Sequence, residues 1–154
     1  MPSTAQTPRP RKPRVFIDAD VLFAGSAGPS DYGASLVVLR MAEITLVDAY
    51  TCLQVIVEAE RNLVAKLPQA LPAFRMIVSR SLTVVDNPSD SDLSTYNGLA
   101  DAGDLPILVA ALKTGCPWLV SFNTRHYHPG HPDITVLPPG EFLLRVRDTL
   151  SMLG

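Results

Sequence analysis

Carboxylate side chains stand at the edges of apolar stretches at three places in this chain. Asp18 ends a run over residues 14–18 that reads as a buried parallel strand, Glu58 follows Val57, and Asp104 opens an apolar helix. Open α/β sheets bind ligands at the carboxyl ends of their strands, so we expect these acids to meet at one sheet edge. Hard oxygen ligands select Mg²⁺ or Mn²⁺. We therefore predict a divalent metal site.

Such a site suits phosphodiester hydrolysis, because the bound ion lowers the pKa of water, orients it and neutralises charge growing on the phosphate. Without the ion the acids would repel one another, so the site should need its metal or show raised pKa values. Auxiliary roles are expected for nearby polar residues: Asp20 as a supporting residue or helix cap, Asn123 and Asp101 in orienting the second shell or the attacking water, and Ser121 in bonding a ligand or phosphate. Ordinary explanations stay open for single residues, namely helix capping for Asp18 and Asp104 and a turn for Asn123.

Two glutamates compete for the helical position in this set. Glu58 and Glu60 are two residues apart, about 200° around a helix, so they cannot both face one site. A helical projection places Glu60 in the middle of an apolar face and Glu58 opposite it. That face comprises Leu53, Ile56, Val57, Leu63, Val64 and Leu67. By this criterion alone Glu60 is the odder residue, because burying an unpaired carboxylate is costly.

Composition sets the broad class. The 154 residues suggest one domain, with residues 14–154 folded and residues 1–13 forming a basic, Pro-rich disordered tail rather than a signal peptide. A net charge of −2 gives no global attraction to nucleic acid, so contact must come from local basic groups or the metal. Cys52 and Cys116 lie in apolar stretches and are expected to be buried, reduced thiols of a cytoplasmic protein. No apolar run reaches the roughly 20 residues of a membrane helix.

Strands alternate with helices along the chain, which predicts a parallel sheet covered on both faces. Strands are expected over residues 14–18, 44–47, 82–85, 118–121 and 134–137. Helical segments are expected over residues 21–24, from a Ser30 or Asp31 cap to 43, from a Thr51 cap to before Pro68, and over 71–79, 89–99, 104–113 and 139–152. Residues 25–29 are predicted to be a small-residue loop near the site. The histidines His126, His128 and His131 share a Pro/Gly-rich segment that reads as a loop rather than a zinc site.

The ordered series resembles the PIN-domain nucleases, especially the bacterial and archaeal branch that includes toxins of toxin–antitoxin pairs. The matching pieces are VFIDADVL at 15–22, VIVEAERNL at 55–63, GDLPILVAA at 103–111 and WLVSFN at 118–123, with the closing strand and helix over 134–142. The resemblance implies a three-layer α/β/α sandwich with about five parallel strands, and Asp18, Glu58 and Asp104 as metal-binding acids. The family's apolar positions fit Glu58 better than Glu60. Asn123 stands where the family commonly has Asp, and Asp20 restores a charge.

The resulting hypothesis is a Mg²⁺- or Mn²⁺-dependent endoribonuclease for single-stranded RNA, the toxin of a two-gene module, with Asp18, Glu58, Asp104 and Asn123 in the site. Arg125, His126 and the N-terminal basic residues are expected to contact the RNA backbone. A cognate antitoxin is expected to place a basic side chain in the acidic cleft.

Three further readings stay open. A degenerate PIN fold would bind RNA or a protein without catalysis. A haloacid-dehalogenase-like phosphatase would use Asp18 as its nucleophile, although no acidic pair follows Lys113. The apolar residues of the last helix serve either a homodimer or the core; they are Phe142, Leu143, Leu144, Val146, Leu150 and Met152.

Overall fold

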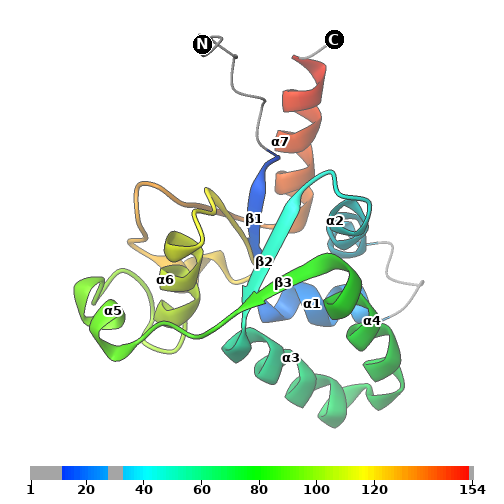
Figure 1. The fold of residues 1–154 in the computed structure, drawn as a ribbon, viewed down its shortest axis with the longest axis horizontal. Coiled ribbons are helices and arrows are strands. Elements are labelled where there is room, and N and C mark those ends of the chain that lie inside the picture. Colours follow the sequence, from blue (N-terminus) through cyan, green and yellow to red (C-terminus); the bar gives the residue numbers. More distant parts are fainter. Residues whose placement is uncertain (1–11, 28–32, 153–154) are drawn as a thin grey trace, which may run out of the picture.

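The fold is built on a parallel sheet with the strand order β3-β2-β1-β4-β5 (Figure 1). The structure is a computed structural model that describes residues 12–27 and 33–152. The strands are β1 (Arg14–Ile17), β2 (Asp48–Cys52), β3 (Leu82–Val85), β4 (Trp118–Val120) and β5 (Thr135–Leu137). Each neighbouring pair runs parallel. The predicted parallel sheet of about five strands is confirmed.

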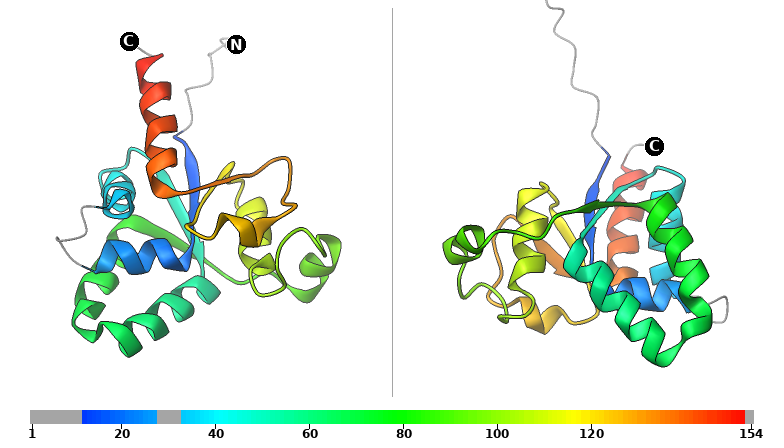
Figure 2. Two further views of the ribbon diagram at one scale, coloured as in Figure 1. Left: turned by 180° about the vertical axis from the view of Figure 1, so that it is seen from behind. Right: turned by 60° about the horizontal axis from the view of Figure 1, so that its bottom comes forward.

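Helices cover both faces of this sheet. They are α1 (Ala19–Ser26), α2 (Ala34–Glu43), α3 (Leu53–Lys66), α4 (Leu71–Ser81), α5 (Asp90–Thr95), α6 (Leu105–Lys113) and α7 (Pro139–Ser151), with 3₁₀ turns η1 (Pro68–Ala70) and η2 (Thr124–Tyr127). Helices α1, α2, α4 and α7 gather on one face, and α6 with α5 lies on the other (Figures 1 and 2). Helix α3 contacts α1, α4 and α6 beyond the carboxyl end of β2. The three-layer sandwich is thus confirmed.

The position of β1 in the middle of the sheet explains why residues 15–17 are all apolar. Val15, Phe16 and Ile17 of β1 are fully buried, because helices cover the sheet on both sides and β2 and β4 flank the strand. Phe16 pairs in register with Tyr50 of β2 and Leu119 of β4. A buried strand of this kind holds whatever follows it, here Asp18, in a fixed position.

The second strand lies later in the chain than predicted. The predicted strand over 44–47 is wrong. Ile44 and Leu46 are at least half exposed, and Thr45 adopts a left-handed φ of 65° in the turn that ends α2. The strand is β2, at Asp48–Cys52. The apolar character of 44–47 misled the prediction because a helix-ending turn can expose apolar residues.

Thr51 is part of β2 rather than the cap of α3. Its buried hydroxyl donates to the carbonyl of Ile17 at 2.9 Å, and Cys52 occupies the N-cap position of α3. Cys52 makes no side-chain cap bond to α3. The Thr51–Ile17 bond therefore ties β2 to β1 immediately before Asp18.

Gly25 lies inside α1, so the predicted loop over 25–29 is wrong at its start. A Cβ at Gly25 would collide with the side chain of Leu39, which is buried in α2. The small residue is there for close packing of α1 on α2. Ser30 and Asp31, the predicted caps of α2, lie outside the described residues, and the described part of that helix starts after Gly33.

The remaining elements follow the sequence prediction closely. Helices α4, α6 and α7 and strands β3, β4 and β5 match to within one or two residues. Helix α5 is shorter than expected but is capped by Ser89 with a reciprocal bond from Asp92. Cys52 and Cys116 are buried free thiols. Within residues 12–27 and 33–152, none of the helices is long and apolar enough to cross a membrane.

Candidate metal-binding site

The candidate site begins at Asp18, which directly follows β1. This carboxylate is only 6% exposed. Its Oδ1 accepts a bond from the backbone N–H of Ala19 at 2.7 Å, so Asp18 also caps α1. Its Oδ2 accepts from the Ser121 hydroxyl and from the Tyr127 hydroxyl, each at 2.7 Å. A carboxylate offers about four lone pairs, so one on Oδ1 stays available for a cation.

The position of Asp18 coincides with a reversal of the strand order. From β1 the sheet extends to β2 and β3 on one side and to β4 and β5 on the other. Ser121 follows β4 and bonds Asp18 across this point. Crevices at such switch points are the usual ligand sites of open α/β sheets. The topology thus places Asp18 and Ser121 at an edge of the sheet where ligands commonly bind.

Asp20 forms a second polar centre beside Asp18. Its Oδ2 accepts bonds from the backbone N–H of Phe122 at 3.1 Å and from the side-chain amide of Asn123 at 3.0 Å. Its Oδ1 is buried and has no hydrogen-bond partner among the described residues. Burial, and next the charge of Asp18, raise the pKa of Asp20 to about 6. Asn123 therefore binds Asp20 in this structure rather than facing the other acids directly.

Helix α3 buries a different face from the one the helical projection indicated. Its buried residues are Val55, Ala59 and Leu63, while Leu53, Val57 and Val64 are about half exposed. The projection identified the wrong buried face because it considers only which residues are apolar. In the structure α3 packs at the end of the sheet against α1, α4 and α6, and these neighbours determine which of its side chains are buried.

Glu58 and Glu60 lie on opposite borders of the buried face. Glu60 contacts Arg75 of α4 at 3.9 Å on the surface. Glu58 lies on the side of the site: partial burial raises its pKa, and the charges of Asp18 and Asp104 raise it further. The two glutamates thus have different partners, and Glu58 is the one that shares an electrostatic environment with the two aspartates.

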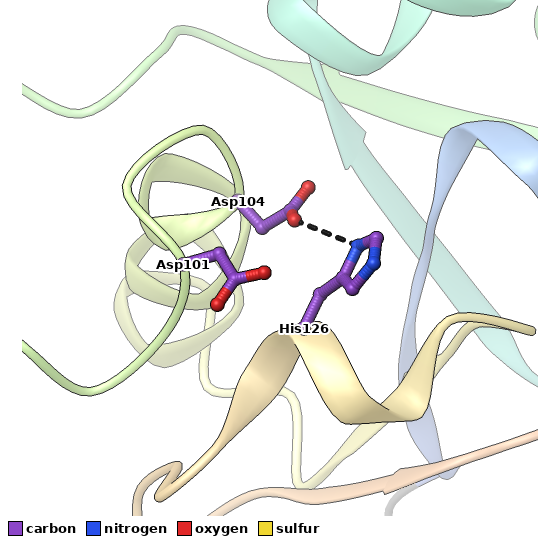
Figure 3. A group of neighbouring side chains, drawn as sticks. All are labelled: Asp101, Asp104 and His126. Carbon is purple, nitrogen blue, oxygen red and sulfur yellow. Dashed lines mark ion pairs between the residues drawn. The ribbon is translucent and has the colours of Figure 1, made fainter.

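Asp104 and His126 bring the third segment and η2 together. The Asp104 Oδ2 lies 3.1 Å from the His126 Nδ1, and Asp101 lies beside them (Figure 3). Burial raises the pKa of Asp104, as does the charge of Asp18, whereas the contact with His126 lowers it. Asp104 occupies the N-cap position of α6 but makes no side-chain cap bond, and its carboxylate faces His126 (Figure 3).

Three carboxylates from separate segments therefore influence one another at the carboxyl edge of the sheet. We call Asp18, Glu58 and Asp104 the acidic site. Burial raises the pKa of Glu58 and of Asp104, the charge of Asp18 raises both further, and a bound cation would relieve that repulsion. The donor set is made of hard oxygens, which fits a divalent ion.

Comparison with known proteins agrees with this geometry. A family model described as the PIN domain matches residues 14–125, which contain every residue of the acidic site. The chain belongs to the PIN domain family. Among solved structures, this PIN domain is similar to VapBC2 from Rickettsia felis, crystallised with a DNA fragment from their promoter. That likeness has a TM-score of 0.58 and 13% identity, and covers 80% of this chain and 96% of the other. A comparison with curated proteins gave no match.

Two residues that position the acids in this PIN domain were missed from the sequence. Tyr127 is 2% exposed and donates to Asp18 from η2. Gln54, one turn before Glu58, donates from its side-chain amide to the carbonyl of Gly103 at 2.8 Å, immediately before Asp104. Neither has a local pattern that signals its role, because both partners are distant in sequence.

The expected RNA contacts divide between two ends of the molecule. Arg125 is exposed on η2, next to the acidic site. Arg14 is at the opposite end of β1 from Asp18, where it donates to the carbonyl of Thr114 and stacks on Tyr50. The basic residues at positions 9 and 11 lie outside the described residues. Arg125 is thus exposed to solvent, whereas Arg14 is engaged with Thr114 and Tyr50.

Proposed function

We propose that this PIN domain is a metal-dependent endoribonuclease that cleaves single-stranded RNA, and that it is the toxin of a toxin–antitoxin pair. The folded unit is residues 14–154, and it acts in the cytoplasm, where its buried thiols would stay reduced. Membership of the PIN family supports nuclease chemistry in general. The substrate, the metal and the partner are the parts that need experiment.

The observation that carries this proposal is the electrostatic coupling of Glu58 and Asp104 to Asp18. The carboxylates come from the end of β1, from α3 and from the start of α6, and each of the last two has its pKa raised by the charge of Asp18. Neighbouring carboxylates raise one another's pKa, and a bound cation would stabilise their charged forms. Mg²⁺ or Mn²⁺ is the ligand class that this donor set fits.

The side chains around the acidic site have separable tasks. A divalent ion held by Asp18, Glu58 and Asp104 would supply an activated water and neutralise phosphate charge. Tyr127 and Ser121 fix the Asp18 carboxylate by bonds to Oδ2. Asn123 and the Phe122 N–H hold Asp20 in place. Arg125 offers an exposed positive charge to the RNA backbone.

The test is cleavage of a fluorescent single-stranded RNA by the purified chain with Mn²⁺, with Mg²⁺ and with EDTA. Cleavage is expected with a divalent ion only, and Asp18→Asn is expected to reduce it by at least a hundredfold. Asp148→Asn, at an exposed position on α7, is the matched control and should keep full activity. Circular dichroism and a melting curve show whether each variant is folded.

The other outcomes distinguish the alternatives. Cleavage that survives both EDTA and Asp18→Asn would contradict the mechanism. Failure to bind Mn²⁺ at millimolar concentration in calorimetry would favour a PIN fold that only binds RNA or protein. Trapping of a phosphoryl group on Asp18 would favour a phosphatase.

An antitoxin partner is supported by one relative, since the similar Rickettsia felis structure is of VapBC2 on promoter DNA. We propose that the antitoxin inserts a basic side chain between the carboxylates of the acidic site, where the negative charge is concentrated. The product of an adjacent small gene should then inhibit Mn²⁺-dependent cleavage. Replacing its inserted Arg or Lys by Ala should relieve that inhibition, and unchanged inhibition would argue against this mode of contact.

A homodimer through α7 is a further proposal. Phe142 is buried in the core, whereas Leu144 and Leu150 of α7 and the following Met152 are about half exposed or more. We propose that these exposed apolar side chains contact a second copy of the chain. Light scattering at micromolar concentration should give twice the chain mass, and Leu150→Lys should return it to the monomer.

A further inference from the structure

A cluster of mixed chemistry adjoins the acidic site. Asp101, Asp104 and His126 each place one ligand atom within 4.8 Å of the others. Figure 3 shows both carboxylates turned toward the imidazole ring, which reaches them from η2. We call these residues the histidine group. Asp104 belongs to both the histidine group and the acidic site, so the two are parts of one continuous centre.

Asp104 and Asp101 are not occupied by helix capping. The Asp104 backbone at the start of α6 is in the αR region, and its side chain makes no cap bond. The carbonyl of Asp101 accepts the bonds from the N–H groups of Asp104 and Leu105, at 2.9 and 2.8 Å. Because the main chain satisfies the start of α6, both carboxylates are available for another partner.

The third member is held in place by the backbone. The N–H of Asp101 donates to the carbonyl of His126 at 2.8 Å, which fixes the loop before α6 against η2. The His126 side chain is 44% exposed and the Asp104 side chain 23% exposed, so solvent and ions can reach both. The histidine group is therefore accessible but pre-positioned.

The separation of His126 and Asp104 suits two ligands of one ion. The Nδ1–Oδ2 distance is 3.1 Å. Adjacent ligands of an octahedral ion with bonds of about 2.1 Å lie about 3 Å apart. In the absence of metal a hydrogen bond holds the His126 and Asp104 side chains at this distance, so ion binding would require little rearrangement.

We propose that His126 donates an imidazole nitrogen to a divalent ion bound by the histidine group, with Asp104 and Asp101 as the oxygen ligands. This inference rests on the proposed function, of which it specifies the metal. An imidazole suits transition ions, whereas Mg²⁺ takes oxygen ligands almost exclusively. The centre consequently prefers Mn²⁺ to Mg²⁺, and His126 is a metal ligand rather than a contact to the RNA backbone.

The experiment is pulsed electron paramagnetic resonance on the full chain with one equivalent of Mn²⁺. The spectrum should contain the hyperfine coupling of a directly bound ¹⁴N nucleus. His126→Gln should lose that coupling and weaken Mn²⁺ binding in calorimetry by about tenfold or more, with Mg²⁺ binding changed by less than about threefold. His128→Gln is the matched control, because His128 is an exposed histidine two residues away and outside the group.

Each result decides. Absence of nitrogen coupling in the wild type, or coupling and affinity unchanged in His126→Gln, overturns the inference. RNA cleavage with Mn²⁺ but without nitrogen coupling would leave the proposed nuclease standing and reject His126 as a ligand. Nitrogen coupling in a protein that cuts no RNA would support His126 as a metal ligand and reject the proposed nuclease. No Mn²⁺ binding at millimolar concentration rejects both.

Discussion

The hydroxyl of Tyr127 lies 2.7 Å from Oδ2 of Asp18, and both side chains are buried although 109 positions separate them in sequence. The Asp18 charge and the hydrogen bond to Asp18 also raise the pKa of the Tyr127 phenol, after burial as the main cause, so the hydroxyl stays a donor at any physiological pH. This bond links the end of β1 to η2, and with it the acidic site to the segment that carries His126.

Removing that hydroxyl should destabilise the protein. Tyr127→Phe leaves one bonding position of the buried Asp18 carboxylate unsatisfied, which costs about 1–3 kcal/mol. Urea unfolding in EDTA measures the loss. Tyr96→Phe is the control, because Tyr96 packs edge-on against His131 and its hydroxyl makes no bond to the residues the structure describes. Equal losses in the two variants would mean that the Asp18 contact contributes nothing specific.

Stability of the metal-free protein should depend on Asp20. Its pKa is raised from 3.8 to about 6 in the folded state, so the folded state binds more protons than the unfolded state across that interval. The contribution of Asp20 is therefore present at low pH and lost as the pH rises through about 6. Because the group is partly exposed, the loss is on the order of 1–2 kcal/mol after screening.

The variant that tests this pH dependence is Asp20→Asn. Its amide oxygen can replace Oδ2, which accepts the bonds from Phe122 and Asn123, and it does not titrate. Between pH 4 and pH 7 the free energy of unfolding of the variant should rise relative to that of the wild type. Asp148→Asn, on the exposed side of α7, should run parallel to the wild type. If the difference in unfolding free energy between Asp20→Asn and the wild type stayed constant over this pH range, the raised pKa of Asp20 would be contradicted.

Mn²⁺ should stabilise the wild type by binding the folded state alone. At a free concentration a hundredfold above the dissociation constant, the gain is about 2.7 kcal/mol. Asp104→Asn removes a charge that belongs to both the acidic site and the histidine group, so most of that gain should disappear. Thermal melts with and without Mn²⁺ measure it. A full gain in Asp104→Asn would place the ion elsewhere.

Gln54 should matter for the arrangement of the acids. Gln54→Leu loses the bond to the Gly103 carbonyl that ties α3 to the segment carrying Asp104, at a cost of about 1 kcal/mol in unfolding free energy. Mn²⁺ affinity and RNA cleavage should each fall about tenfold, because Glu58 and Asp104 lose their common support. Gln69→Leu, an exposed change in η1, is the control. If both variants keep wild-type affinity, the Gln54 bond has only a structural role.

Packing of α1 on α2 should tolerate no methyl group at Gly25. Gly25→Ala forces the added carbon against the buried side chain of Leu39, and overpacking of this kind costs about 1–3 kcal/mol. Gly140→Ala in α7 is the matched control, since nothing lies within 4 Å of its added carbon. It should be neutral or slightly stabilising by helix propensity. Melting temperatures of the two variants measure the difference.

Residue patterning was enough to indicate the fold class. The apolar run of β1 with an acid at its end, and the alternation of strand and helix signals, led directly to a parallel sheet with Asp18 at its carboxyl edge. These features are local: burial on both faces demands continuous apolar residues, and a helix start has its own capping chemistry. They can be read without knowing what packs against what.

The tertiary structure decided which side chains meet. The helical projection favoured Glu60 and the family resemblance favoured Glu58. In the structure the charges of Asp18 and Asp104 raise the pKa of Glu58 after burial as the main cause, whereas Glu60 contacts Arg75 of α4. His126 looked like one of three loop histidines until η2 placed it on Asp104. Electrostatic and hydrogen-bond partners that lie tens of residues apart in sequence are brought together by the packing of the layers. Local sequence patterns do not determine that packing.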